Sequence, residues 1–109
     1  MRDVLVTPDG TKLITAGGDK TIRVWDLRTY SEVMKLEGHT VAVRGLAITG
    51  DGKTLISGSS DKTCRAWDLA TGKEAKRYGT ETAEVESVAV SGDGKYVLTG
   101  NKSGVVTVY

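Results

Sequence analysis

The stretch LISGSSDKTCRAWDL, residues 55–69, decides how this chain folds, because a near copy of it, ITAGGDKTIRVWDL, occupies residues 14–27. The two copies are 42 residues apart, and Trp25 and Trp67 stand at equivalent places in them. A third copy continues the pattern as far as Tyr109, which stands 42 residues after Trp67. A fixed period of this length is typical of architectures in which similar units stack on one another.

Each repeat has the texture of β-strands. Short runs rich in Val, Ile, Leu and Thr are separated every few residues by Gly, Asp, Ser or Thr, and no long apolar stripe has the helical period. Four strands are predicted in the middle repeat. They lie at about residues 42–48, 53–58, 63–68 and 73–78.

An Asp-Gly pair separates the first two strands of every repeat, at residues 9–10, 51–52 and 93–94. We expect it to supply the positive φ angles of a tight hairpin turn, so that adjacent strands are antiparallel. The strands GLAI and TLIS carry small or apolar residues on both faces, which suits a sheet sandwiched between neighbours. Sheets stacked on sheets in this way make a propeller.

Two dipeptides give the middle repeat a family likeness: Gly38-His39 before its first strand and Trp67-Asp68 at the end of its third. Together with Trp25-Asp26 and the 42-residue period, they resemble the WD40 repeat over essentially the whole chain. The resemblance implies an all-β fold, a WD40-type β-propeller segment with three blades of antiparallel four-stranded sheet, the last blade lacking its outer strand. We expect a single partial propeller with blade 1 at about residues 1–37, blade 2 at about 38–79 and an incomplete blade 3 at about 80–109.

The resemblance also implies a structural network of buried hydrogen bonds. In WD40 repeats, a His before the first strand, a Ser or Thr in the second, an Asp in the next turn and the Trp of the third strand form it. The matching residues are His39, Ser57, Asp61 and Trp67 in the middle repeat, and Thr15, Asp19 and Trp25 in the first. The third repeat keeps Thr99 but has Glu81, Ser103 and Tyr109 at the other places, so we expect a weaker network there.

A catalytic alternative exists for the same residues, because His39, Ser57 and Asp61 are the residue types of a hydrolase triad. A triad needs an exposed nucleophile and an oxyanion hole, and the chain has no nucleophile-elbow motif. Residues 52–54, GKT, resemble the end of a phosphate-binding loop, but Ala47 stands where that motif requires glycine. We therefore expect no catalytic, cofactor-binding or metal-binding residues.

Positions that differ between repeats are where a partner-specific surface is expected. Arg44 and Glu86 share one place in the first strand, and Ser60 and Lys102 share another just before the turn to the third strand. We interpret these four residues as candidates for a mixed-charge surface that contacts a protein partner. The alternative is that the four side chains are merely solvated.

Composition argues against several classes of function. Fifteen Lys and Arg against fourteen Asp and Glu give a net charge of +1, so no strong field would attract nucleic acid. Pro8 and Asp9 interrupt the apolar N-terminal run, and no stretch approaches membrane-spanning length. A single cysteine, Cys64, rules out an internal disulfide framework. We expect a cytoplasmic protein that binds neither nucleic acid nor membrane.

Three blades leave two large sheet faces without a neighbour, and residues 105–109, VVTVY, predict an apolar edge strand. Either the chain is part of a longer propeller, or copies assemble so that blades from several chains close one ring, as the six blades of two chains would. The hypothesis is a non-catalytic WD-repeat scaffold that mediates protein–protein interaction, with protein partners or other copies of itself. The alternatives are a propeller hydrolase with a site in the central channel, and an engineered or fragment assembly unit with no ligand.

Overall fold

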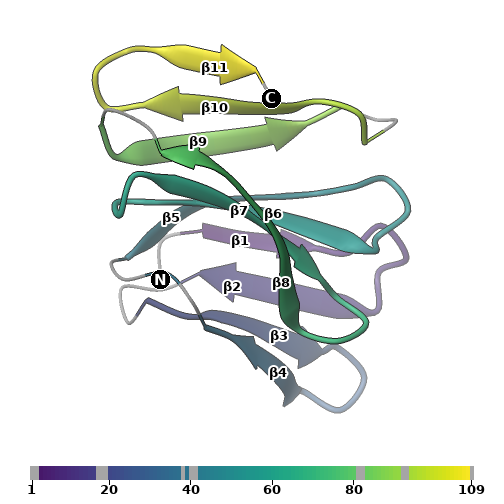
Figure 1. Ribbon diagram of the computed structural model, residues 1–109. Helices are drawn as coiled ribbons and strands as arrows, with labels where there is room; N and C mark the ends of the chain where they lie inside the picture. Colours follow the sequence, from purple (N-terminus) through teal and green to yellow (C-terminus); the bar gives the residue numbers. More distant parts are fainter. Residues whose placement is uncertain are drawn as a thin grey trace.

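The computed structural model describes residues 3–16, 20–37, 39, 42–80, 83–91 and 94–108. These residues form eleven strands and no helix, which confirms the prediction of an all-β fold. The strands make three antiparallel sheets of four, four and three strands (Figure 1). The shortfall of one strand in the third sheet, counted over the described residues, agrees with the sequence pattern.

Each sheet contains strands that follow one another in the chain. Sheet 1 consists of β1 (Asp3–Val6), β2 (Lys12–Ala16), β3 (Ile22–Asp26) and β4 (Ser31–Leu36). Sheet 2 consists of β5 (Val43–Ile48), β6 (Thr54–Ser59), β7 (Thr63–Asp68) and β8 (Lys73–Thr80). Sheet 3 consists of β9 (Val85–Val90), β10 (Val97–Asn101) and β11 (Val106–Val108). The proposed blade boundaries at residues 37/38 and 79/80 stay a prediction.

The second and third strands pair in the same register in all three sheets. Ile14 lies opposite Val24, Ile56 opposite Ala66, and Leu98 opposite Val108, and each pair follows the previous one by 42 residues. Because side chains alternate between the two faces of a strand, equal register places equivalent residues on equivalent faces. The 42-residue period of the sequence is therefore also the period of the structure.

Sheet 2 lies between sheets 1 and 3, and the two apolar cores lie between the sheets (Figure 1). In the first core, Ile14 and Val24 of sheet 1 belong to one cluster with Leu55 and Trp67 of sheet 2. In the second core, Ile56, Cys64 and Ala66 of sheet 2 meet Val97 of sheet 3. Full burial of one large aliphatic side chain stabilises by about 1.5–3 kcal/mol, so each buried side chain of these stacked faces contributes substantially to the stability.

Close backbone contact between sheets 2 and 3 depends on two glycines. A Cβ on Gly45 of β5 would lie 3.1 Å from the Cα of Ser87, and one on Gly58 of β6 would lie 2.5 Å from Val85 Cγ1. Between sheets 1 and 2 a side chain makes the link instead, since the Leu46 amide donates to Asp3 Oδ2 over 3.0 Å. The inner strands are therefore joined in two different ways at the two interfaces.

The Asp-Gly turns differ from the prediction in one respect. Among the described residues of these turns, only glycine has a positive φ, which is +73° at Gly10 and +72° at Gly52. The aspartate acts through its side chain: Asp51 Oδ1 accepts from Thr49 Oγ1 over 2.6 Å and from the Lys53 amide over 3.0 Å. Asp residues commonly bond the backbone two residues on, and this tightens the loop without a positive φ at Asp. The expectation that the pair supplies positive φ therefore holds through its glycine, and Asp9 and Asp51 contribute side-chain hydrogen bonds instead.

Candidate functional site

A buried chain of hydrogen bonds in and beside sheet 2 contains four residues that the sequence singled out. His39 Nδ1 lies 2.9 Å from Asp61 Oδ2, and His39 Nε2 lies 2.6 Å from Ser57 Oγ. Trp67 Nε1 donates to the same Ser57 oxygen over 2.8 Å. Ser57 lies on β6 and Trp67 on β7, Asp61 lies in the turn that joins these strands, and His39 precedes β5. The structure thus brings a loop, a turn and two strands together at one point.

The chemistry of these groups sets the direction of each bond. An indole N–H can only donate and a carboxylate can only accept, so Trp67 donates to Ser57 and the His39 Nδ1–H donates to Asp61. His39 Nε2 then accepts the hydroxyl hydrogen of Ser57. Burial lowers the pKa of His39 below its ordinary 6.5, against the raising effect of the Asp61 carboxylate, so the ring is neutral at pH 7.

Solvent does not reach the centre of this network. Ser57 has no exposed surface, Trp67 is 1 % exposed and His39 is 6 % exposed. Ser57 Oγ accepts the Trp67 hydrogen and donates its own to His39, so its only donor and one of its two acceptor positions are used. The arrangement ties the pieces of sheet 2 together around a hydroxyl that has no exposed surface.

Arg65 extends the network; from the sequence it was expected, like its equivalent Arg23, only to pack between blades or at the rim. Its guanidinium is almost fully buried, with Nη1 3.1 Å from Glu74 Oε1 and Nη2 3.8 Å from Asp61 Oδ2. Sheet 1 has the same ion pair at the equivalent positions, Arg23 with Glu32, at 3.0 Å and partly exposed. The sequence did hold a signal for it, because both the arginine and the glutamate recur at the 42-residue spacing.

In the other two sheets, the described residues include parts of this arrangement. In sheet 1, Trp25 Nε1 donates to Thr15 Oγ1 over 3.1 Å, and both side chains are partly exposed; Asp19, predicted to join them, lies outside the described residues. In sheet 3, Thr99 is buried, whereas Glu81 and Tyr109 lie outside the described residues. The turn after β10 is held by Asn101, whose Oδ1 accepts from the Ser103 amide over 3.0 Å.

Three of the four partner-contact candidates lie together where sheets 2 and 3 meet. Arg44 Nε donates to Ser60 Oγ, and Arg44 Nη2 and Lys102 Nζ each lie 3.7 Å from Glu84 Oε2. Glu84, which the sequence analysis did not name, holds the group together; its backbone oxygen also accepts from the Lys102 amide over 2.8 Å. We call Arg44, Ser60, Glu84 and Lys102 the Glu84 cluster. Glu86 is exposed on β9, and among the described residues no ion pair joins it to the cluster.

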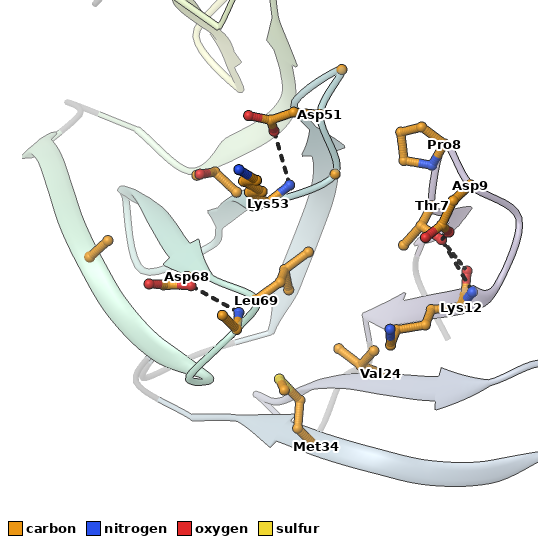
Figure 2. A pocket seen from close by; sticks show the side chains of 15 residues that line it. Thr7, Pro8, Asp9, Lys12, Val24, Met34, Asp51, Lys53, Asp68 and Leu69 are labelled. Carbon is orange, nitrogen blue, oxygen red and sulfur yellow. Dashed lines mark hydrogen bonds between the residues drawn. The ribbon is translucent and has the colours of Figure 1, made fainter.

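A groove of about 900 Å³ separates the Asp-Gly turns of sheets 1 and 2. Figure 2 shows Pro8 and Asp9 on one wall, Asp51 and Lys53 on the other, and Met34 and Val24 at its base. The carboxylates of Asp9 and Asp51 accept hydrogen bonds within their own turns. A hydrogen bond from the Thr7 hydroxyl, aided by those from Thr11, lowers the pKa of Asp9 to about 2. The groove therefore offers an apolar base and charged rims whose acidic groups are committed to local structure.

Two further findings concern metal binding and membrane spans. Within the described ranges, no three His, Cys, Asp or Glu side chains are grouped so that they could hold a metal ion. In the same part of the chain, the structure contains no helix long and apolar enough to cross a membrane.

A family model for the WD domain, G-beta repeat, matches three segments of the chain, at residues 1–26, 30–68 and 72–109. Together the segments cover nearly all of the sequence. The second segment contains the whole His39–Ser57–Trp67 network. The first two segments each end with a Trp-Asp dipeptide.

Proposed function

The chain belongs to the WD40 repeat family, whose members generally serve as scaffolds for protein interaction and are typically non-catalytic. From this premise we propose that the chain is itself a non-catalytic interaction scaffold. Its blades complete a propeller, either with other copies of the chain or as part of a longer propeller, and the propeller binds a protein partner. It uses no cofactor and acts in the cytoplasm. Cytoplasmic cysteines are kept reduced, so a lone buried cysteine such as Cys64 needs no disulfide partner there.

The observation that carries the non-catalytic assignment is the buried state of Ser57. A hydrolase using the His39, Ser57 and Asp61 side chains would need its nucleophile at the surface, next to hydrogen-bond donors for the developing oxyanion. Ser57 is fully buried, and its oxygen accepts the Trp67 indole hydrogen. The hydrolase alternative is tested with a fluorophosphonate probe, which labels an activated serine: we expect no labelling of the folded chain, and labelling at Ser57 would establish the enzyme.

The Glu84 cluster is the surface that we assign to the protein partner. It sets two cations around one carboxylate at a junction between two sheets, and Lys102 and Arg44 remain partly exposed, with 66 % and 28 % of their side chains accessible. Such a group can exchange internal ion pairs for pairs with an acidic partner surface, and rim charges of this kind act mainly on association rate and specificity. Glu86, on the adjacent strand, adds the opposite charge.

The test compares binding by the wild-type chain with binding by a charge-reversal variant, Arg44→Glu with Lys102→Glu. A protein captured by immobilised wild-type chain and identified by mass spectrometry is then titrated against both forms. We expect the variant to bind it at least about tenfold more weakly, because several like charges would face each other. Lys62→Glu, an exposed lysine outside the cluster, is the matched control and should leave the affinity unchanged. Equal binding by all three forms would remove the cluster from the proposal.

A further inference from the structure

The groove between the Asp-Gly turns of sheets 1 and 2 opens onto the first apolar core. Val24 of β3 is a buried member of that core, and Met34 of β4 and Leu69, just after β7, are partly buried against it. All three side chains line the groove, and Figure 2 shows Val24 and Met34 at its base. An apolar side chain that enters the groove would therefore extend an existing core. Methionine suits such a base, because its flexible thioether adapts to differently shaped partners.

Backbone contacts between the two sheets hold the groove open at a fixed width. A Cβ on Gly72, in the turn between β7 and β8, would lie 3.3 Å from Met34 Sδ. A Cβ on Gly52 would lie 3.5 Å from Pro8 Cδ. The sheets thus already touch at two places beside the groove, and about 900 Å³ stays open between them. This volume is typical of preformed ligand sites.

Three carboxylates line the groove, and only one oxygen of each is committed to its turn. Asp9, Asp51 and Asp68 each use Oδ1 to accept the amide hydrogen two residues on, over 2.8–3.0 Å. Within the described ranges, no hydrogen bond reaches Oδ2 of any of the three. Each turn therefore leaves one carboxylate oxygen available to a cationic donor from outside.

The groove is locally acidic on a slightly basic molecule. Its lining contains the three carboxylates and two ammonium groups, those of Lys12 and Lys53, so its net charge is −1, whereas the whole chain carries +1. Hydrogen bonds from neighbouring threonine hydroxyls lower the pKa of Asp9 to about 2 and also lower the pKa of Asp51, so both groups stay ionised near neutral pH. The charge of the groove complements a cation next to its apolar base.

We propose that this groove binds a short segment of a protein partner in which a large apolar side chain stands next to an Arg or Lys. The apolar side chain packs on Met34 and Leu69, and the cation bonds the free carboxylate oxygens at the rim (Figure 2). Both features of the occupant follow from the lining. An acidic segment would face three carboxylates, and a segment without an apolar side chain would leave the base of the groove uncovered.

The groove lies at the opposite end of sheet 2 from the Glu84 cluster. Asp51 lies in the turn before β6 (Thr54–Ser59), whereas Ser60 of the cluster follows that strand. The two surfaces share no residue. The inference therefore goes beyond the proposed function: the chain holds two partners at once, an acidic surface at the Glu84 cluster and a basic segment in the groove.

The test titrates synthetic peptides into the isotope-labelled wild-type chain and follows its amide signals by NMR. The probe is Gly-Ser-Leu-Arg-Ser-Gly with both ends blocked; one control peptide has Glu in place of Arg, and the other has Gly in place of Leu. We expect the probe to shift the amides of residues 51–54 and 68–70, and each control peptide to bind at least about fivefold more weakly. No shift at millimolar probe, shifts confined to other residues, or equal binding of the Glu peptide would overturn the inference.

A matched pair of variants tests the carboxylates. Asp68 and Asp26 stand at equivalent ends of β7 and β3, and each accepts the amide hydrogen two residues on, over 2.8 and 2.7 Å, but only Asp68 lines the groove. Asn keeps an oxygen for that hydrogen bond and removes the charge. Asp68→Asn should weaken binding of the probe by about threefold, and Asp26→Asn should leave it unchanged. Equal effects of the two substitutions would contradict the proposed contact.

The two binding surfaces can be judged separately. The charge-reversal variant of the Glu84 cluster, Arg44→Glu with Lys102→Glu, should still show the probe-induced shifts at residues 51–54 and 68–70. Loss of these shifts in that variant would contradict a groove that works independently of the cluster. The wild-type titration stands without any variant, so the inference stays testable even if a substitution disturbs folding, and its failure leaves the Glu84 cluster to its own test.

Discussion

At the scale of single residues, Ser57 is the centre of sheet 2. It is the only described residue that bonds both the indole of Trp67 and the imidazole of His39, and it has no exposed surface. Its counterpart in sheet 1, Thr15, bonds the indole of Trp25 alone at a partly exposed site. The equivalent positions in the two repeats thus differ in how many buried hydrogen bonds they make. Matched substitutions at the two positions can measure the resulting difference in stability.

Replacing Ser57 with Ala should destabilise the chain by about 2 kcal/mol, because two buried polar groups, the Trp67 N–H and the His39 Nε2, lose their partner. Thr15→Ala should cost less than about 1 kcal/mol, since water can reach the partly exposed Trp25 N–H. Urea unfolding followed by circular dichroism gives both values. Equal losses would show that burial of the His39 network contributes nothing beyond one hydrogen bond.

His39 gives the molecule a defined response to acid. Its folded pKa lies below the unfolded value of about 6.5, so the unfolded chain binds the proton more readily. The stability tied to the neutral ring is therefore complete above about pH 6.5 and is lost as the pH falls below it. His39 is the one histidine in the chain, so the free energy of unfolding should fall between about pH 7 and pH 5 in the wild type and change little over that window in His39→Gln. An identical fall in both proteins would exclude His39 as its source.

At the scale of elements, the positions of the strands agree closely with the sequence prediction, whereas the contacts between sheets could not be predicted. The third strand of the middle repeat, predicted at residues 63–68, is β7 (Thr63–Asp68). The second was predicted one residue early, because the hairpin loop is longer than a two-residue turn and closes with the Thr49 amide bonded to the Thr54 oxygen. Alternation of apolar residues and turn residues is local information, and it is enough to position a strand to within a residue or two.

The parts that could not be predicted depend on how sheets meet in space. Glu84 holds the cluster of candidate contact residues, but in the sequence it is one acidic residue in a loop with no equivalent motif. Asp3 bonds across to the Leu46 amide of the next sheet, 43 residues away. Such contacts depend on the distance and rotation between neighbouring sheets, and neither quantity can be derived from the repeat period of the sequence. The His39 network and its burial were expected from the family resemblance, while its bond distances and directions came only from the fold.

The contact between β6 and β9 makes a specific demand on one glycine. A Cβ on Gly58 would lie 2.5 Å from Val85 Cγ1 and 2.7 Å from Val88 Cγ1, both in a packed interface. Gly58→Ala should therefore destabilise the chain by about 1–3 kcal/mol through overpacking. The equivalent Gly100→Ala should change stability by less than about 0.5 kcal/mol, because its Cβ would meet only the Ser87 hydroxyl, which can rotate away. Urea unfolding distinguishes the two, and equal effects would mean that the sheets separate readily.

At the scale of the whole molecule, three sheets make two interfaces and leave two faces uncovered. In a stacked-repeat protein the stability is approximately a sum of terms within units and between neighbours, so the end sheets have one neighbour term where sheet 2 has two. Sheet 2 also has the complete His39 network and the more buried arginine ion pair, Arg65 with Glu74. Among the described residues, sheet 2 is therefore the most firmly held.

The unequal surroundings of the two tryptophans provide an optical reporter without any label. Trp67 is 1 % exposed in the core between sheets 1 and 2, whereas Trp25 is partly exposed on the face of sheet 1 opposite to Ile14 and Val24. An indole in contact with water emits fluorescence at longer wavelength and is quenched by dissolved iodide, and a dry one is protected from both effects. The red, quenchable part of the emission therefore belongs to Trp25. When a binding partner covers the face of sheet 1 that carries Trp25, this part should shift to the blue while the Trp67 signal stays constant, so emission colour alone reports whether that face is occupied.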